Sequence, residues 1–366
     1  MGYQKRADFN KRRLLKCLEK DGKWSKIIEY CNQNALDCKS RRKLEDGLDV
    51  HLRSDSVHIY YKGGRILEIK ADVLNIDPSY FYKRKEYDGI PRTHLELLRD
   101  KKWDELKQRN ANYKDWTPEK AESVFEYLKN KRNELFGLGL NPSNKELRNA
   151  YIKSAMQPEN YFRKAMTVMD DWSDALKEVT THQERLLQQK ISVVNKDIKE
   201  SDFLVIDIEF SVSSARDCPF RSEDKKYQTH PRFDIIAVQP KKNFRLAVIE
   251  LKRGLGAVGI TDDDTFDEET KSGVKDHVCK FDATVGNEKG YKCFVSEMQG
   301  VLNMKAHLGI LPHELSKIKI PLEKPEFYLA YAGESMPRFK TACKRADLKC
   351  ICIKDEEYPL LKNNED

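Results

Sequence analysis

The sequence predicts an α/β protein whose C-terminal half is built on one mixed sheet, because helical and strand patterns follow one another there in a simple order. The helical patterns of this half cover residues 174–193, 272–285 and 293–309. The strand patterns cover residues 203–210, 233–238, 244–252, 327–331 and 348–353. One helix, three strands, helices and further strands in this order favour helices packed on a single mixed sheet.

The N-terminal half is predicted to be an α+β region. Leucines and isoleucines at helical spacing predict helices within residues 9–35. Alternating apolar and polar residues on each side of Gly63-Gly64 predict a β-hairpin, because glycine supplies the positive φ of tight turns. Helical periodicity returns over residues 93–135, and Asn141-Pro142-Ser143 breaks it before a further helical stretch.

Length and composition indicate a two-domain protein of the cytoplasm. The chain has 366 residues, which predicts about two domains, and we place them at residues 1–170 and 171–366. Charged residues make up 35% of the chain, but 16 Tyr, 15 Phe and 4 Trp argue against disorder. No apolar run is long enough to cross a bilayer, and nine cysteines without a C-x-x-C pair suit reduced thiols, so no membrane association is expected.

Positive charge is concentrated near the N-terminus, and this distribution indicates what kind of partner the protein can bind. The net charge is +7, and residues 1–53 hold 14 Lys and Arg against 8 Asp and Glu. Such a basic segment can neutralise phosphates, because Lys and Arg displace the counterions of nucleic acids. The same charges also suit a solvated helix surface, so the sequence leaves both interpretations open.

Two carboxylates and a lysine meet at one end of the strand pair in residues 233–252. Counting outward from a turn at residues 240–243 places Asp234 opposite Ile249, within one residue of Glu250. Glu250 and Lys252 are two residues apart on one strand, so their side chains share a face. Charges at the end of so apolar a strand are costly to bury unless a partner neutralises them. Two carboxylates beside the carbonyl of Leu251 form an oxygen donor set that Mg²⁺ prefers, and the Lys252 ammonium can stabilise charge developing on a phosphate.

These residues resemble the PD-(D/E)xK nuclease superfamily. Asp234, followed by Glu250-Leu251-Lys252 and preceded by a helix with Glu184, matches its motif over residues 174–335, although Phe233 replaces the name-giving proline. The resemblance implies a restriction-endonuclease-like αβββαβ core and Mg²⁺- or Mn²⁺-dependent hydrolysis of phosphodiester bonds. It also implies that Asp234 and Glu250 are metal ligands, that Lys252 is the catalytic lysine and that Glu184 is an accessory acid.

The accessory carboxylate has two candidates. Glu184 lies on a predicted helix whose glutamine neighbours suit a solvated face equally well. Glu209, at the end of strand 203–210, can point into the same cleft as a further metal ligand. Asp207 shares a face with Glu209 by the period of two, so at least one of these acids is expected to do more than pack in the core. The resemblance also suggests a polar contribution from Gln299 or Lys275.

Two further features receive structural interpretations. Asp55 followed by Glu68-Ile69-Lys70 repeats the motif letters, but its strands are more polar and no helix with an aligned acid precedes them, so an exposed sheet is expected. His277 lies in the polar run Lys275-Asp276-His277 and is expected to be a surface histidine rather than a phosphate contact.

The sequence therefore predicts a metal-dependent nuclease whose N-terminal region binds nucleic acid or a partner. DNA is favoured over RNA because it is the usual substrate of the family that the chain resembles. Nucleases of this fold often act as dimers, and the resemblance is compatible with a homodimer. The functional alternative is a non-catalytic nucleic-acid or protein binding module that keeps the fold, and the structural alternative is a surface hairpin in which Glu250 and Lys252 simply pair.

Overall fold

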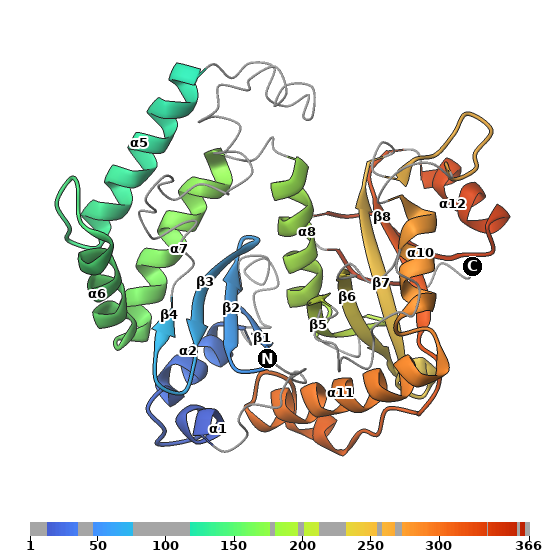
Figure 1. The fold of residues 1–366 in the computed structure, drawn as a ribbon, viewed down its shortest axis with the longest axis horizontal. Coiled ribbons are helices and arrows are strands. Elements are labelled where there is room, and N and C mark those ends of the chain that lie inside the picture. The colour runs from blue at the N-terminus through green and yellow to red at the C-terminus, as the bar shows by residue number, and fades with distance from the viewer. Residues whose placement is uncertain are drawn as a thin grey trace.

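The computed structural model contains two sheets surrounded by helices (Figure 1). It describes residues 13–35, 47–75, 118–175, 180–196, 201–211, 232–254, 258–267, 273–334, 336–356 and 359–362. The mixed α/β architecture predicted from the sequence is confirmed. Among the helices that the structure describes, none combines the length and the apolar composition needed to cross a membrane.

The first sheet belongs to the N-terminal half and is antiparallel throughout. Its strands are β1 (Asp49–Leu52), β2 (Val57–Tyr61), β3 (Gly64–Ile69) and β4 (Leu74–Asn75), in that spatial order. The predicted hairpin is the β2–β3 pair, and its turn needs positive φ at Lys62 (45°) and Gly63 (75°). The helices α1 (Arg13–Leu18) and α2 (Ser25–Ala35) confirm the helical prediction for the start of the chain, and β1 packs against α2.

The described residues after the first sheet and before residue 176 form three helices. They are α5 (Pro118–Leu135), α6 (Asn144–Ala155) and α7 (Pro158–Ala175). The predicted break before residue 144 is confirmed, because Ser143 begins α6 with a capping box that it shares with Glu146. Residues 93–117 of the predicted helical stretch lie outside the described residues. The predicted domain boundary near residue 170 lies within α7.

The second sheet contains every strand predicted for the C-terminal half. Its spatial order is β5 (Leu204–Ser211), β6 (Arg232–Gln239), β7 (Arg245–Arg253), β8 (Glu326–Ala332) and β9 (Lys349–Ile353). The first three strands are antiparallel neighbours, whereas β8 runs parallel to β7 and β9 runs parallel to β8. The sheet is therefore mixed, as predicted.

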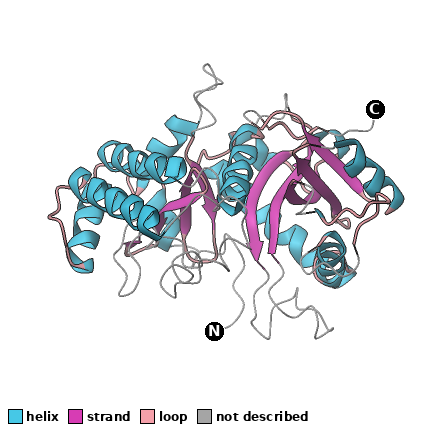
Figure 2. Ribbon diagram, turned by 90° about the horizontal axis from the view of Figure 1, so that it is seen from above, coloured by secondary structure: helices cyan, strands magenta, loops and turns pink. Residues whose placement is uncertain are grey.

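Helices lie outside both sheets and between them (Figure 2). The helix between the sheets is α8 (Thr180–Val194), which contacts β1 of the first sheet and β5, β6 and β7 of the second. It begins later than the predicted residue 174, which is still part of α7. The other helices of the C-terminal half are α10 (Val274–Ala283), α11 (Glu288–His307) and α12 (Met336–Arg345), with short 3-10 turns at Pro240–Lys242 and His313–Lys317.

The two halves share buried apolar surface. One hydrophobic cluster contains Val50 and Ile59 of the first sheet together with Phe210 of the second sheet and Phe294 of α11. A second cluster lies between α8 and the other face of the second sheet, where Leu187 and Ile191 pack on the strands. Burial of this kind fixes α8 against β6 and β7, and it is at this contact that the candidate site lies.

Candidate active site

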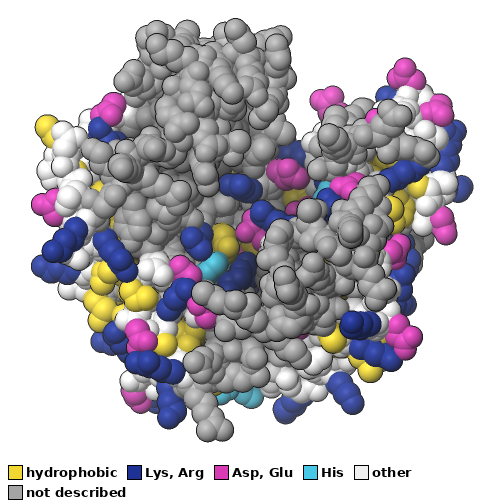
Figure 3. Space-filling view, viewed as in Figure 1, with side chains coloured by type: hydrophobic (Ala, Val, Ile, Leu, Met, Phe, Trp, Pro, Cys, Tyr) yellow, Lys and Arg dark blue, Asp and Glu magenta, His cyan; other side chains and the backbone are white. Residues whose placement is uncertain are grey.

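One open cavity gathers three of the four predicted catalytic residues, Glu184, Asp234 and Glu250, whereas Lys252 is not among the residues that line it. Its volume is about 280 Å³, and it lies where α8, β6, β7 and α10 meet. The residues that line it are Glu184, Arg185, Gln188, Arg232, Asp234, Glu250, Leu251 and His277. Figure 3, viewed from the same side as Figure 1, shows acidic, basic and histidine side chains close together near the middle of this face.

The strand register brings Asp234 directly opposite Glu250. The observed pairs run from Gln239 opposite Arg245 to Ile235 opposite Ile249, and the next position joins the two carboxylates. The predicted register, which set Asp234 opposite Ile249, was wrong by one residue. The turn is one residue longer than expected, because both Asn243 (φ 51°) and Phe244 (φ 60°) adopt the left-handed conformation before β7 begins.

Glu250 is the most enclosed carboxylate of the cavity. It is 2% exposed, and its Oε1 accepts a hydrogen bond from Lys252 Nζ at 2.8 Å and lies 3.1 Å from His277 Nδ1. Burial alone raises the pKa of Glu250, but the hydrogen bond with His277 and the charge of Lys252 outweigh it, so the pKa falls below its ordinary value. Its Oε2 is buried and has no hydrogen-bond partner among the described residues. This carboxylate is therefore charged, with one oxygen still to be satisfied.

Asp234 faces Glu250 but favours its protonated form. Its Oδ2 accepts a hydrogen bond from the main-chain nitrogen of Leu251 at 2.9 Å, and its carbonyl accepts one from Gln188 Nε2 at 2.6 Å. Burial and the charge of Glu250 raise the pKa of Asp234 well above the ordinary value, more than Lys252 and the Leu251 hydrogen bond lower it. Such a shift means that, with both carboxylates ionised, their negative charge would exceed the positive charge of the neighbouring side chains.

Lys252 completes the predicted motif. It is 7% exposed, and its Nζ also lies 3.3 Å from His277 Nε2. Burial lowers the pKa of Lys252, but the charge of Glu250 and the hydrogen bond to it raise the pKa above the ordinary lysine value. The side chain is therefore a cation at neutral pH, and it acts as a hydrogen-bond donor rather than as a base.

Of the two candidates for the accessory acid, the structure brings only Glu184 to the cavity. Its side chain lies beside the motif residues, and burial raises its pKa. Glu209 is not among the lining residues and forms an ion pair with Arg232 instead. A bulge in β5 near Asp207 and a positive φ at Glu209 (52°) break the alternation that the sequence prediction assumed. The proposed metal ligand Glu209 therefore lies beside the cavity rather than in it.

The structure adds residues that the sequence analysis missed. His277 is part of the site, so the prediction of a surface histidine was wrong. The signal was present, because Val274, His277, Val278 and Phe281 follow the spacing of one helix face. Arg185, Gln188 and Arg232 carried no comparable pattern. The suggested Gln299 lies elsewhere and ties α11 to the chain near Ile318, and Lys275 does not line the cavity.

The donor set of the cavity suits a hard divalent cation. Among the residues that the structure describes, no three His, Cys, Asp or Glu side chains are grouped as a ready metal site. Mg²⁺, however, is commonly held by one or two carboxylates and completes its shell with water and substrate oxygens. Asp234 and the unpartnered Oε2 of Glu250 offer such a pair, and Leu251 lies between them at the cavity wall. The residues present therefore fit a two-carboxylate site.

The repeated motif in the first sheet has a different environment. Lys70 Nζ lies 2.9 Å from Asp55 Oδ2 and 3.7 Å from Glu68 Oε1, and the Asp55 side chain is 53% exposed. These three residues form ion pairs with one another. The expectation of an exposed sheet holds only for Asp55, because the Glu68 side chain is 15% exposed and alternate residues of the strands are buried. The same letters still provide a matched control within the chain.

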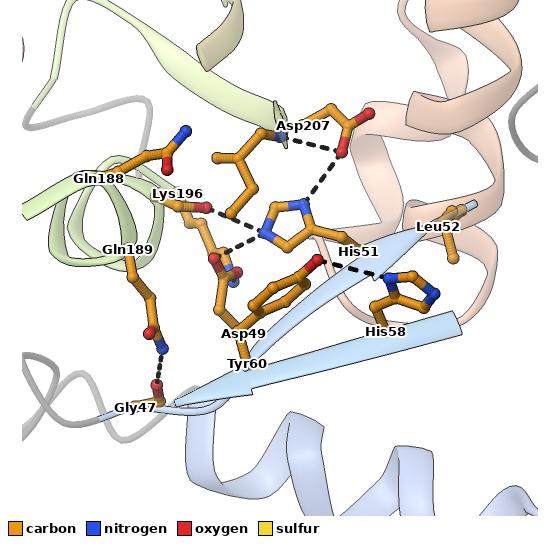
Figure 4. Close-up of polar contacts among 12 residues, drawn as sticks. Gly47, Asp49, His51, Leu52, His58, Tyr60, Gln188, Gln189, Lys196 and Asp207 are labelled. Atoms are coloured by element: carbon orange, nitrogen blue, oxygen red, sulfur yellow. Dashed lines mark hydrogen bonds and ion pairs between the residues drawn. The ribbon is translucent and has the colours of Figure 1, made fainter. Parts of the chain in front are cut away.

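A second polar group is buried between the two sheets (Figure 4). His51 on β1 contacts Asp49 Oδ2 through Nε2 at 2.6 Å and Asp207 Oδ1 through Nδ1 at 3.1 Å. Arg53 donates to the same Asp207 oxygen at 2.8 Å, and Lys196 lies 2.9 Å from Asp49 Oδ1. Asp207 therefore does more than pack in the core, as expected. Both carboxylates have cationic partners, so this group joins the sheets and leaves no donor set open.

Comparisons with known proteins add no assignment. No protein-family model matches the chain, and neither a curated protein nor a solved structure matches it.

Proposed function

We propose that this protein is a metal-dependent nuclease that hydrolyses phosphodiester bonds. The observation that carries the proposal is the pair Asp234 and Glu250 at an open cavity, with the buried Lys252 hydrogen-bonded to one Glu250 oxygen and the other oxygen unsatisfied. The order α8, three antiparallel strands, α10 and α11, and a parallel strand agrees with the αβββαβ core of the PD-(D/E)xK nucleases. We extend the proposal to a restriction-endonuclease-like fold on that basis.

The carboxylates of Asp234 and Glu250, with the Leu251 carbonyl, would hold Mg²⁺ or Mn²⁺. When bound, the cation supplies positive charge opposite a phosphate and lowers the pKa of water. Glu250 is already ionised in the free protein, whereas the raised pKa of Asp234 means that this carboxyl would lose its proton on binding the cation.

The side chains around the carboxylates have separate roles in the proposal. Lys252 stays protonated, and from its position against Glu250 Oε1 its ammonium group would stabilise charge on the attacking water and the phosphate oxygens. His277 on α10 contacts Glu250 Oε1 and so fixes the carboxylate. Glu184, whose pKa is raised by burial, lies at the cavity wall, where its carboxyl group can orient water.

DNA is the substrate that we propose, with the cytoplasm as the location. The choice of DNA follows from the family resemblance. The location is supported by the described cysteines, which are all free thiols. They are Cys17, Cys31, Cys279, Cys293, Cys343, Cys350 and Cys352.

The test is metal-dependent cleavage with matched variants. Purified protein is incubated with plasmid, linear and single-stranded DNA and with RNA, in Mg²⁺, Mn²⁺ or EDTA. Glu250→Gln and Lys252→Ala should each lower kcat by at least about 100-fold, because each removes a group that acts on the transition state. Glu68→Gln and Lys70→Ala, the same changes in the repeated motif, should keep wild-type rates. Equal losses in both pairs would reject the proposed site.

The second candidate function is a non-catalytic nucleic-acid-binding module. One observation favours it: Lys252 already neutralises Glu250 without a metal, and His277 contacts the same carboxylate oxygen. Calorimetric titration with Mn²⁺ separates the two functions. A nuclease should bind the ion through Asp234 and Glu250, and binding should disappear in Asp234→Asn. A protein that binds nucleic acid but no divalent cation would be the module.

A further inference from the structure

Two arginines share the cavity with the carboxylates. Arg185 follows Glu184 on α8, and Arg232 is the first residue of β6, two positions before Asp234. Both line the cavity. Neither is explained by the chemistry proposed above, because the buried Lys252 already supplies the cation next to Glu250.

The arginines lie nearer to solvent than the motif residues. Arg185 is exposed and the Arg232 side chain is 47% exposed, whereas Glu250 and Lys252 are buried. The cavity therefore has the buried Glu250, which is hydrogen-bonded to Lys252, at its floor and arginines at its mouth. Arg185 has no ion pair or hydrogen bond with any residue that the structure describes, and Arg232 pairs with Glu209.

An exposed guanidinium at the mouth of an acid-lined cavity points to an anionic ligand. Guanidinium groups match phosphate oxygens in geometry and are always charged, so they are suited to bind phosphate. A phosphate at the mouth is not the one at the floor, since the two positions differ in depth. A nucleic acid strand offers such a second phosphate at each neighbouring nucleotide.

We propose that Arg185 and Arg232 bind the phosphate next to the one that is cut, so that the substrate is an oligonucleotide with at least two phosphates. This inference rests on the proposed nuclease function. It assigns a substrate class, because a compound with a single phosphodiester engages only the floor of the cavity. Glu209 then acts as a positioning residue that holds Arg232 at the mouth until a phosphate replaces it.

Two substrates of different length test the inference. Bis(p-nitrophenyl) phosphate has one phosphodiester, and a short oligonucleotide has several. Arg185→Gln and Arg232→Gln should each raise KM for the oligonucleotide about tenfold, the effect of losing one charge-assisted hydrogen-bond partner. The same variants should hydrolyse bis(p-nitrophenyl) phosphate at the wild-type rate. Glu209→Gln should lower the oligonucleotide KM about twofold, because an exposed ion pair competes only weakly.

The control removes one charge far from the cavity. Lys241 lies in the turn at the opposite end of the β6–β7 pair, and its side chain is 76% exposed. Lys241→Gln should leave KM for both substrates unchanged. Equal effects of the arginine variants on both substrates, or no effect on either, would overturn the inference while leaving the nuclease function intact.

A binding measurement decides the matter if the wild-type protein cuts neither substrate, in which case the proposed function itself fails. Anisotropy of labelled single-stranded DNA and RNA oligonucleotides is followed against salt concentration. Each arginine variant should weaken binding about tenfold and reduce the slope of log K against log salt by about 0.7, the value for one lost phosphate contact on a single strand. Unchanged slopes, or no oligonucleotide binding by the wild type, would overturn the inference.

Discussion

Glu250 shows how one side chain can be held in a state that its surroundings oppose. Burial favours its neutral form, yet Lys252 and His277 keep it ionised. Both partners contact Oε1, which leaves Oε2 for an incoming cation. The raised pKa of Asp234 completes this arrangement, since a second ionised acid opposite Glu250 needs positive charge that the described protein does not supply in full.

His277 should therefore matter for metal binding although it need not touch the ion. Replacing His277 by Ala removes the group that fixes Glu250 Oε1, so Glu250 can turn toward Lys252 and away from Asp234. Loss of such an outer partner typically costs 10- to 100-fold in metal affinity or activity, and we expect about that loss. Calorimetry with Mn²⁺ measures the affinity, and cleavage assays measure kcat.

His307→Ala is the matched control for that experiment. His307 lies on α11 and forms an exposed ion pair with Glu19, so the substitution should leave metal affinity unchanged. His277→Asn, which keeps a polar side chain, should recover part of the lost affinity. If the His277→Ala protein has normal metal affinity and normal kcat, His277 contributes only to packing and the prediction is contradicted.

At the scale of elements, the β2–β3 turn of the first sheet supports the helix of the active site. Gly63 packs so closely on α8 that an added Cβ would lie 3.0 Å from the Leu186 nitrogen and 3.1 Å from the Arg185 Cβ. Its main-chain nitrogen donates to Gln189 Oε1, which fixes the turn on the helix. The N-terminal hairpin therefore positions the helix that carries Glu184 and Arg185.

Gly63→Ala should consequently lower activity as well as stability. The substitution strains a residue with φ 75° and pushes on the α8 backbone, so a loss of about 3 kcal/mol in unfolding free energy is expected. Gly137→Ala is the control, because Gly137 has φ 66° but open space around its Cβ position. It should cost only about 1 kcal/mol and no activity. Urea unfolding and kcat measure both; equal activities for the two variants would contradict the support role.

The elements around the site could be predicted because they depend on local patterns. The strands of the C-terminal half, the hairpin at Gly63 and the break before α6 all follow from periodicity and turn residues. The register between β6 and β7 was missed, because it depends on the left-handed φ of Asn243 and Phe244. Glu209 was misplaced because a bulge in β5 cannot be seen in an apolar run. Arg185 and Arg232 come together through packing of α8 on the sheet, which no local pattern specifies.

At the scale of the whole molecule, the two sheets are joined by buried charge as well as by apolar surface. Asp49 and His51 come from the first sheet, and Asp207 comes from the second. Removing one partner from such a group leaves another charge buried without compensation, which usually costs several kcal/mol. The alternation of β5 indicated that Asp207 or Glu209 had a special role, but it could not indicate that the partner lies more than 150 residues earlier in the chain.

Lys305 on α11 makes this buried group sensitive to pH. Its Nζ lies 3.3 Å from His51 Nδ1, and burial lowers its pKa from 10.5 to about 7. The charged or titratable groups around it are Asp49, His51, Arg53, Lys196 and Asp207. The attraction of the two aspartates does not fully offset the loss of water, so the folded state releases the Lys305 proton more readily than the unfolded state does.

The sign of the resulting pH effect is fixed by this difference. Between about pH 7 and the ordinary lysine pKa, the unfolded state binds more protons at Lys305 than the folded state, so this residue makes the protein more stable as pH rises. The contribution is at most about 1.4 kcal/mol for each pH unit. Lys305→Met keeps the length of the side chain and removes the titration, so it should lose this rise and be more stable than the wild type near pH 7.

Urea unfolding of both proteins across this pH range measures the effect, because titrating groups that do not interact with Lys305 cancel in the difference between them. The curves of wild type and Lys305→Met should converge as pH rises above 7. Lys292→Met, an exposed position on the same helix, should run parallel to the wild type near pH 7, well below the ordinary lysine pKa. If the Lys305→Met curve also runs parallel, Lys305 keeps its proton in the folded protein. The buried group then carries one more positive charge than its two aspartates neutralise, and the joint between the sheets depends on apolar packing to offset it.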